Sequence, residues 1–116
     1  MDLDAIRADL EQIVREADAT IAVIELEAEE AEDSLDGPLD EADVAATQAE
    51  AEQELALAGV ARQRKEEAEA ALVRLEAGAY GICIDCGEKI AEARLEFRPE
   101  ASRCLADQEK FEESEA

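Results

Sequence analysis

Apolar residues recur at intervals of three and four over the first third of the chain. They are Leu3, Ile6, Leu10, Ile13, Ala17, Ile21, Ile24, Ala28, Ala31 and Leu35. This spacing puts them on one face of a helix with a period close to a heptad. No Gly or Pro interrupts the stretch, so the pattern predicts one helix over residues 3–35.

The segment Asp36-Gly37-Pro38 is expected to end this helix. Gly suits the left-handed position past a helix end, and Pro cannot continue a helix. A second stripe with the same spacing follows: Val44, Thr47, Ala51, Leu55, Ala58, Ala61, Lys65, Ala68, Leu72 and Leu75. It predicts a second helix from near Asp40 to Ala77, with Gly78 as its C-cap.

Two apolar stripes joined by a short turn predict a long antiparallel coiled-coil hairpin over residues 1–78, with the turn at 36–40. About 33 residues at 1.5 Å each give an arm of roughly 50 Å. Alanines in the middle of the second stripe would let the two backbones approach closely. We expect the free end of this thin arm to be its least stable part.

After Ala79 the helical period stops, and residues 79–116 are expected to form a second, smaller unit. Residues 89–97 show a short strand-like alternation at Ile90, Arg94, Leu95 and Phe97. A terminal helix is predicted from Ser102 to about Glu113. The chain is therefore expected to be mainly α, a hairpin followed by a small finger with a short C-terminal helix.

The finger contains the motif Cys83-x-x-Cys86-Gly87, and Cys104 follows at the start of the terminal helix. Two residues between cysteines let one metal ion bind both sulfurs, and Gly permits the sharp turn that follows. This layout is typical of a zinc-ribbon or treble-clef site. Asp107 stands where a fourth cysteine would, and carboxylate oxygen is an acceptable but harder zinc ligand.

We favour one zinc ion held by Cys83, Cys86, Cys104 and Asp107. Three alternatives stay open: a metal-free fold with buried thiols, zinc with water or another acid as its fourth ligand, and a redox-active Cys-x-x-Cys. No thioredoxin-like strand–helix pattern precedes the motif. The sequence alone does not settle metal occupancy.

The charge of the chain is strongly negative, with 33 acidic and 11 basic residues and a net charge of -22. Fifteen acids and no Lys or Arg lie from Glu16 to Val60. Phosphate backbones bind basic surfaces, so direct nucleic-acid binding is not expected, and an anionic membrane would repel the chain. A basic channel or groove fits as a partner, although solubility or adaptation to salt also accounts for the charge.

The chain has no His and three Cys. Without the commonest general base, and without an apolar pocket, we expect no enzymatic activity. Cysteines with no visible secretory signal favour a reducing, cytoplasmic setting and metal binding over disulfides. No apolar run approaches the length of a membrane span.

Acidic residues gather where the hairpin turns, in the segment Asp40-Glu41-Ala42-Asp43-Val44-Ala45. Asp40 is a good N-cap, and Asp43 stands where a capping-box acid would. Acids in a first helical turn also interact favourably with the helix dipole. Helix capping is therefore the local interpretation of this segment.

The motifs together resemble the DksA/TraR family of bacterial RNA polymerase regulators. The segments that carry the resemblance are Tyr80-Gly81-Ile82-Cys83, Cys86-Gly87, Arg94-Leu95-Glu96-Phe97-Arg98-Pro99, Cys104 and the tip pattern Asp40-x-x-Asp43-x-Ala45. The coiled coil precedes the finger, as in the family. The resemblance covers nearly the whole chain, apart from an N-terminal segment that longer members carry.

This resemblance implies a regulator that binds RNA polymerase directly and does not bind promoter DNA. Its coiled coil would enter the secondary channel, and the tip residues Asp40, Asp43 and Ala45 would contact polymerase and modulate initiation. Capping and contact are compatible, because one Asp can cap the helix while the other contacts polymerase. We expect a monomer, and the sequence does not indicate activation or inhibition, or which promoters respond.

The chain departs from the family pattern at several basic positions. Val60, Glu67 and Gln108 stand where the resemblance leads us to expect basic residues. The candidates left for contacts with a nucleotide or the channel rim are Arg62, Arg64, Lys65 and Arg98. A response to guanosine tetraphosphate therefore has little support.

Two other classes of function compete with polymerase regulation. One is an acidic coiled-coil adaptor whose finger is purely structural. The other is a thiol enzyme that uses Cys83 and Cys86, which would require an accessible thiolate of low pKa.

Overall fold

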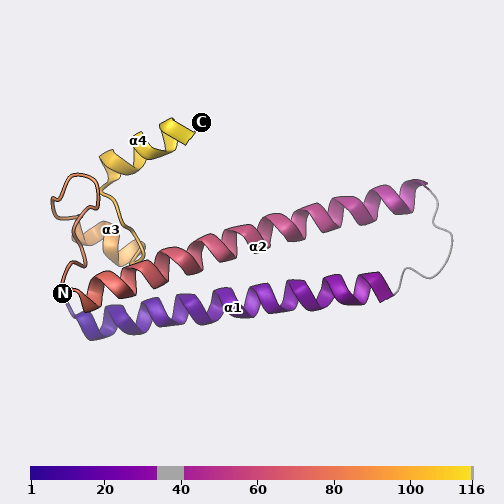
Figure 1. The fold of residues 1–116 in the computed structure, drawn as a ribbon, viewed down its shortest axis with the longest axis horizontal. Helices are drawn as coiled ribbons and strands as arrows, with labels where there is room; N and C mark the ends of the chain where they lie inside the picture. Colours follow the sequence, from indigo (N-terminus) through magenta and orange to yellow (C-terminus); the bar gives the residue numbers. More distant parts are fainter. Residues whose placement is uncertain (34–40, 116) are drawn as a thin grey trace.

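The structure, a computed structural model, describes residues 1–33 and 41–115, and for 31–33 and 41–43 it describes the backbone alone. The helices in this part of the chain are α1 (Leu3–Asp33), α2 (Glu41–Glu76), α3 (Glu92–Phe97) and α4 (Leu105–Glu115). α1 and α2 run antiparallel as a long arm, and the finger lies beside the start of α1 and the end of α2 (Figure 1). The predicted turn at 36–40 lies outside the described residues. The predicted helical hairpin with a small finger is confirmed.

Asp2 caps the start of α1. Its Oδ1 accepts hydrogen bonds from the backbone N–H groups of Asp4 at 3.1 Å and Ala5 at 3.2 Å. These donors have no partner within the helix, so the carboxylate stabilises the first turn.

Gly78 ends α2, as the sequence predicts. It has φ of 75°, and its N–H donates to the carbonyl of Leu75 at 3.2 Å. The N–H of Ala79 donates to the carbonyl of Arg74 at 2.8 Å. This pair of bonds is the Schellman arrangement, which turns the chain from the arm into the finger.

The best-packed part of the arm lies beside the finger. Leu10, Ala68 and Ala71 are fully buried, and Ile13 is 7% exposed. Partly buried residues that pack against this cluster are Ile6, Val14, Leu72 and Tyr80. Most of these residues belong to the two predicted stripes. Val14 and Ala71 each neighbour a stripe residue in sequence, and Tyr80 belongs to the finger. Alanines 68 and 71 let the two helices approach closely here, whereas Ala51, nearer the start of the predicted second stripe, is exposed.

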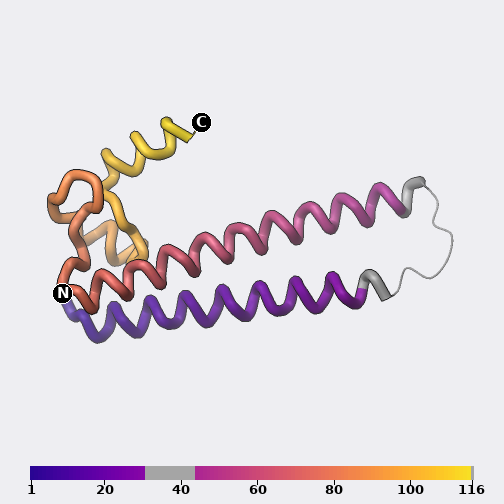
Figure 2. The backbone as a smooth tube through the Cα atoms, viewed as in Figure 1, coloured from indigo at the N-terminus to yellow at the C-terminus, as the bar shows by residue number. Residues whose placement is uncertain are grey.

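Toward the free end the two helices separate (Figure 2). Among the described side chains of α2, Ala58 is the buried one nearest to the start of the helix, whereas Leu55 is 69% exposed. Val23 and Leu26 of α1 are also more than half exposed. The second predicted stripe therefore packs from Ala58 to Leu75 and not before it. Alanine offers little apolar area here, and the acids of both helices repel one another without a base between them.

The finger has a core of its own. Cys83, Ile90 and Leu95 are each at most 4% exposed, and Tyr80, Ala101 and Cys104 pack against them. Tyr80 contacts both this cluster and the arm core. Its hydroxyl donates to the carbonyl of Pro99 at 2.9 Å, so this side chain connects arm and finger.

The prediction of a strand over residues 89–97 is wrong. Among the described residues, strand pairing consists of one isolated antiparallel bridge between Ile82 and Lys89, and the chain then forms α3. The carbonyl of Ala91 accepts hydrogen bonds from Arg94 at 3.1 Å and Leu95 at 3.2 Å. Leu95 is buried while Phe97 is 85% exposed, so the apparent alternation does not mark one face of a sheet.

The terminal helix begins later than predicted. Ser102 lies before this helix. The carbonyl of Ser102 accepts a hydrogen bond from the N–H of Ile84 at 2.9 Å, which attaches the segment before α4 to the loop of the finger. α4 has no buried residue and projects away from the finger (Figure 1). In the described part of the chain, none of the helices combines the length and the apolar character that crossing a membrane requires.

Candidate metal centre

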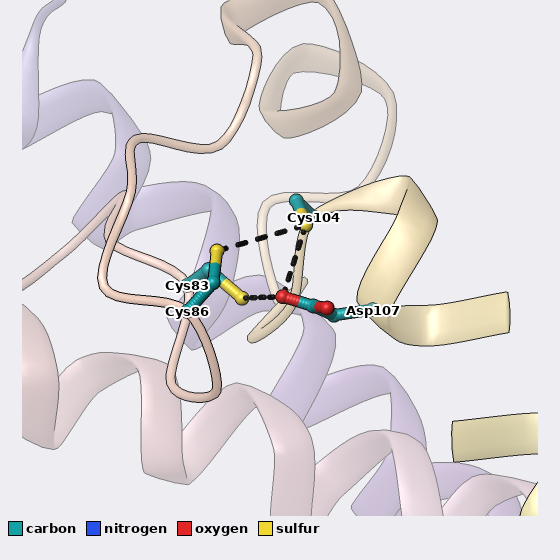
Figure 3. A group of neighbouring side chains, drawn as sticks. All are labelled: Cys83, Cys86, Cys104 and Asp107. Atoms are coloured by element: carbon teal, nitrogen blue, oxygen red, sulfur yellow. Dashed lines mark hydrogen bonds between the residues drawn. The ribbon is translucent and has the colours of Figure 1, made fainter. Parts of the chain in front are cut away.

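Four potential metal ligands come together where the finger meets α4 (Figure 3). Cys83 and Cys86 lie in the loop after the arm, Cys104 directly precedes α4, and Asp107 lies in its first turn. One ligand atom from each lies within 4.8 Å of the other three. Cys104 and Asp107 are three residues apart, which places both on one face of the helix end.

The backbone around Cys83 forms a tight knuckle. The N–H of Cys83 donates to the carbonyl of Glu88 at 2.8 Å, and the N–H of Gly87 donates to the carbonyl of Cys83 at 3.0 Å. Gly87 has φ of 75°, a conformation that favours glycine. The turn predicted after Cys86 is thus present, and it places both sulfurs on the same side as Cys104.

The Asp107 carboxylate lies among the thiols. Its Oδ2 accepts hydrogen bonds from Cys83 Sγ at 3.1 Å and from Cys104 Sγ at 3.3 Å (Figure 3). The sulfurs of Cys86 and Cys104 are 4.0 Å apart. The residue that replaces the fourth cysteine therefore points into the cluster.

The electrostatics of the cluster favour a cation. Thiol hydrogen bonds from Cys86, Cys83 and Cys104 lower the pKa of Asp107. Burial acts to raise the pKa of Cys83, but the N–H groups of Cys86, Cys104 and Asp85 outweigh it, so this pKa is lowered. The Glu88 N–H favours the Cys86 thiolate, yet Asp107 and the other thiols raise its pKa to about 12. Four groups that are anionic when deprotonated share one small space, and a divalent cation would relieve their repulsion.

Three thiolates and one carboxylate fit a single zinc ion. Zinc binds sulfur and carboxylate oxygen in four-coordinate sites, and a full set of four protein ligands is typical of a structural centre. Zinc would supply a crosslink between the knuckle and α4. The ligands predicted from the sequence are therefore the ones that the fold brings together.

The structure describes only part of the predicted tip. Asp40 lies outside the described residues, and so does the side chain of Asp43 in the first turn of α2. Ala45 is exposed on α2. The tip assignment stays a prediction.

Two of the predicted rim contacts have partners inside the arm. Arg62 Nη2 lies 3.2 Å from Glu25 Oε1, and Lys65 Nζ lies 2.6 Å from Asp18 Oδ1. Sequence reasoning missed these pairs, because the stripe positions do not fix how the two helices align. The other two candidates, Arg64 and Arg98, are exposed.

A cleft of about 750 Å³ lies between α2 and α4. Its charged lining includes Arg62, Arg74, Arg103, Glu66, Glu67 and Glu115. Gln108 also lines it, so two positions where basic residues were expected, 67 and 108, face this space with an acid and an amide. The lining is mixed in charge, which gives a nucleotide phosphate no concentrated basic surface.

Comparisons with known proteins point to one family for both the arm and the finger. Residues 78–113 match the prokaryotic dksA/traR C4-type zinc finger. The RNA polymerase-binding transcription factor DksA of Caulobacter vibrioides is 37% identical over 107 residues, which are 90% of this chain and 69% of that protein. The protein of the same name from Haemophilus influenzae is 36% identical over 95 residues, or 82% of this chain and 61% of that one.

A solved structure extends the similarity to the fold. The transcription factor DksA2 of Pseudomonas aeruginosa superposes with a TM-score of 0.76 and 32% identity, over 97% of this chain and 84% of that one. Arm and finger thus occur together and in the same order in a relative of known structure. The chain belongs to the DksA/TraR family, and its C4-type finger has Asp107 at the fourth ligand position.

Proposed function

We propose that this chain is a transcription regulator that binds bacterial RNA polymerase directly and has no catalytic activity of its own. The observation that carries the proposal is the similarity to DksA2 over 97% of the chain, because it spans the arm and the finger together. The relatives from Caulobacter vibrioides and Haemophilus influenzae are named as transcription factors that bind RNA polymerase. Binding to polymerase also favours a cytoplasmic location.

The arm is proposed to enter the secondary channel of polymerase with its free end first. Its distal half carries acids without a base, from Glu16 to Val60. A negatively charged rod is attracted to a channel with basic walls, and such complementarity increases association rates and fixes orientation. Asp40, Asp43 and Ala45 would then lie nearest to the catalytic region and modulate initiation.

The finger, residues 79–116, is proposed to set the direction of the arm, residues 1–78, on the polymerase surface. Tyr80 packs against both cores and donates to Pro99. Burial raises the pKa of this phenol, so it stays protonated and able to donate throughout the physiological range. A rigid joint lets contacts of the finger outside the channel determine where the tip lies.

Several features limit the partners of this chain. The net charge of -22 opposes binding to DNA or to an anionic membrane. The mixed charge of the cleft between α2 and α4 opposes a guanosine tetraphosphate response. We propose that the chain acts as a monomer, since one arm fills one channel.

An acidic adaptor is the second candidate, and the exposed apolar residues of the distal arm favour it. Val23, Leu26 and Leu55 are each more than half exposed and offer contact area to another protein. The adaptor and the regulator differ in whether polymerase is the partner.

The test is a pull-down of core RNA polymerase by the zinc-loaded chain, with a second secondary-channel factor as competitor. We expect capture that the competitor reduces in proportion to its concentration. Capture without competition would move the binding site away from the channel. The absence of capture would favour the adaptor.

A further inference from the structure

Arg103 connects the two halves of the metal centre without being one of its ligands. It directly precedes Cys104, and its side chain is 18% exposed. Its Nε–H donates to Oδ2 of Asp85 at 2.6 Å. Asp85 lies in the knuckle between Cys83 and Cys86, so this bond joins the two ligand-bearing segments.

The same guanidinium also holds α4. Its central carbon lies 4.0 Å from the ring centroid of Phe111, within the range of a cation–π contact. Phe111 and the ligand Asp107 are four residues apart on α4, so both lie on one face of this helix. Fixing the Phe111 ring under the guanidinium therefore also fixes the direction in which Asp107 points.

The position of Arg103 is itself held by the finger. Its carbonyl accepts a hydrogen bond from Nε of Arg94 on α3 at 3.0 Å. The neighbouring carbonyl of Ser102 accepts the N–H of Ile84. The backbone before Cys104 is thus attached to both α3 and the knuckle. These bonds fix the backbone of Arg103, from which its side chain reaches Asp85 and Phe111.

α4 has few other attachments in the described part of the chain. None of its residues is buried, and of the helix pairs only α1 and α2 pack closely on one another. Its contacts with the finger come from the thiol–carboxylate cluster and from the Arg103–Phe111 pair. If the Arg103–Phe111 contact were lost, only the thiol–carboxylate cluster among these contacts would still fix the direction of α4 and the position of Asp107.

We propose that Arg103 is a positioning residue of the metal centre, which holds the knuckle and α4 in the arrangement that brings Asp107 to the three thiolates. A carboxylate is a harder zinc ligand than a thiolate, so this site depends more on correct placement of its fourth ligand. The guanidinium also adds a positive charge next to a centre whose ligands carry four negative charges when deprotonated. The proposal rests on the zinc assignment and is independent of polymerase binding.

The test measures zinc affinity by competition with a chromophoric chelator for the full chain and for Arg103→Ala, Arg103→Lys and Lys89→Ala. Lys89 is an exposed base of the same finger and makes none of the side-chain contacts described above, so Lys89→Ala controls for the loss of one charge. We expect Arg103→Ala to weaken zinc binding about 10- to 100-fold, the usual effect of losing a partner that orients ligands. The zinc affinity of Arg103→Lys should lie between those of Arg103→Ala and the unaltered chain, since lysine keeps the charge and loses the planar donor. Lys89→Ala should bind like the unaltered chain.

Cobalt substitution gives a second readout that general destabilisation does not mimic. The visible absorption of bound Co²⁺ depends on the ligand set, so Arg103→Ala should show a spectrum shifted toward that of Asp107→Ala. If Arg103→Ala does not fold, the milder Asp85→Asn and Phe111→Leu test the two contacts separately, and each should weaken zinc binding. Affinities and spectra equal to those of Lys89→Ala would overturn the proposal while leaving the metal centre in place. A chain that binds no zinc at all would overturn both, and the polymerase pull-down would remain a separate question.

Discussion

Lys65 on α2 forms an ion pair with Asp18 on α1, with 2.6 Å between Nζ and Oδ1. Together with Arg62 and Glu25, it joins the two helices beyond the buried cluster of Leu10, Ile13, Ala68 and Ala71. The hydrogen bond from Lys65 and the charge of Asp18 raise the pKa of the lysine above its ordinary value of 10.5. A basic side chain predicted to contact a nucleotide or the channel rim thus has a partner on the other helix of the arm.

We expect Lys65→Ala to lower the melting temperature of the arm modestly at neutral pH. A lysine pKa that is higher in the folded state stabilises that state fully below 10.5, and this contribution is lost as the pH rises through the folded-state pKa. The difference between the two proteins should therefore vanish at strongly alkaline pH. It should also shrink in about 1 M salt, where the Debye length falls to roughly 3 Å and exposed charges attract one another more weakly.

Thermal unfolding followed by circular dichroism at several pH values and salt concentrations measures this effect. Arg64→Ala is the matched control, because Arg64 is exposed and has no ion pair among the described residues. Equal melting temperatures for the two variants at neutral pH and low salt would show that the pair adds nothing to the arm.

The packing of the arm predicts that a leucine-to-alanine substitution destabilises the chain much more near the finger than in the distal part of the arm. Leu10 is fully buried beside Ala68 and Ala71, whereas Leu55 is 69% exposed. Leu10→Ala should reduce the free energy of unfolding by about 2–5 kcal/mol, the range for a large-to-small change in a core. Leu55→Ala should change it by less than about 0.5 kcal/mol.

Urea unfolding of the two variants beside the parent chain provides the measurement. Amide hydrogen exchange should agree, with slow exchange around Leu10 and Ala71 and faster exchange near Leu55. Similar losses of stability for both variants would mean that the distal helices pack as closely as the proximal ones.

The sequence predicted the hairpin because heptad-like spacing is a local property of each helix. The start of α1, the end of α2 and the cap at Gly78 follow from residues close in the chain. The exposure of Leu55 did not follow. It depends on how far apart two helices lie, and this distance reflects repulsion between segments that are distant in sequence.

The metal ligands were predictable because their spacing encodes one geometry. Cys83, Cys86 and Cys104 form a known pattern, and Asp107 was assigned by its position after Cys104. The contribution of Arg103 was not predictable, since its contacts with Asp85 and Phe111 depend on the folded finger. An arginine adjacent to a ligand cysteine was the one local signal available.

Removal of the metal should unfold the finger and leave most of the helical content. The hydrophobic cluster of the finger has three buried side chains, too few to hold the loop without a crosslink. Most helical residues belong to α1 and α2. Chelation or acidification should therefore abolish the dispersed amide signals of residues 79–115 while the arm stays helical. Protons compete with zinc for the thiolates, so zinc should be released progressively as the pH falls.

Substitutions at position 107 separate the role of this ligand from that of the thiols. Asp107→Ala should weaken zinc binding, and Asp107→Cys should strengthen it beyond the parent chain by completing a four-thiolate set. Elemental analysis of the purified proteins and chelator competition measure both. An Asp107→Ala protein with unchanged affinity would assign the fourth position to water or to another acid.

The tip prediction concerns Asp43, in the first turn of α2. Asp43→Asn should abolish the effect of the chain on transcription initiation while polymerase capture is largely kept. The reason is that the rest of the arm and the finger supply the binding surface, whereas the tip would act near the catalytic region. In vitro initiation assays on several promoters, run beside the pull-down, measure the two properties separately.

Helix capping is the competing account of the same acids, and Asp40→Asn distinguishes the two. Asn caps a helix about as well as Asp, so this change keeps the cap and removes the charge. If Asp40 acts through its charge, Asp40→Asn should reduce the transcriptional effect with no loss of thermal stability. Glu50→Gln, which neutralises an exposed acid farther along α2, should change neither property. An Asp43→Asn protein that regulates normally, or one that loses polymerase capture in step with thermal stability, would assign these acids to capping and place the working surface elsewhere on the arm.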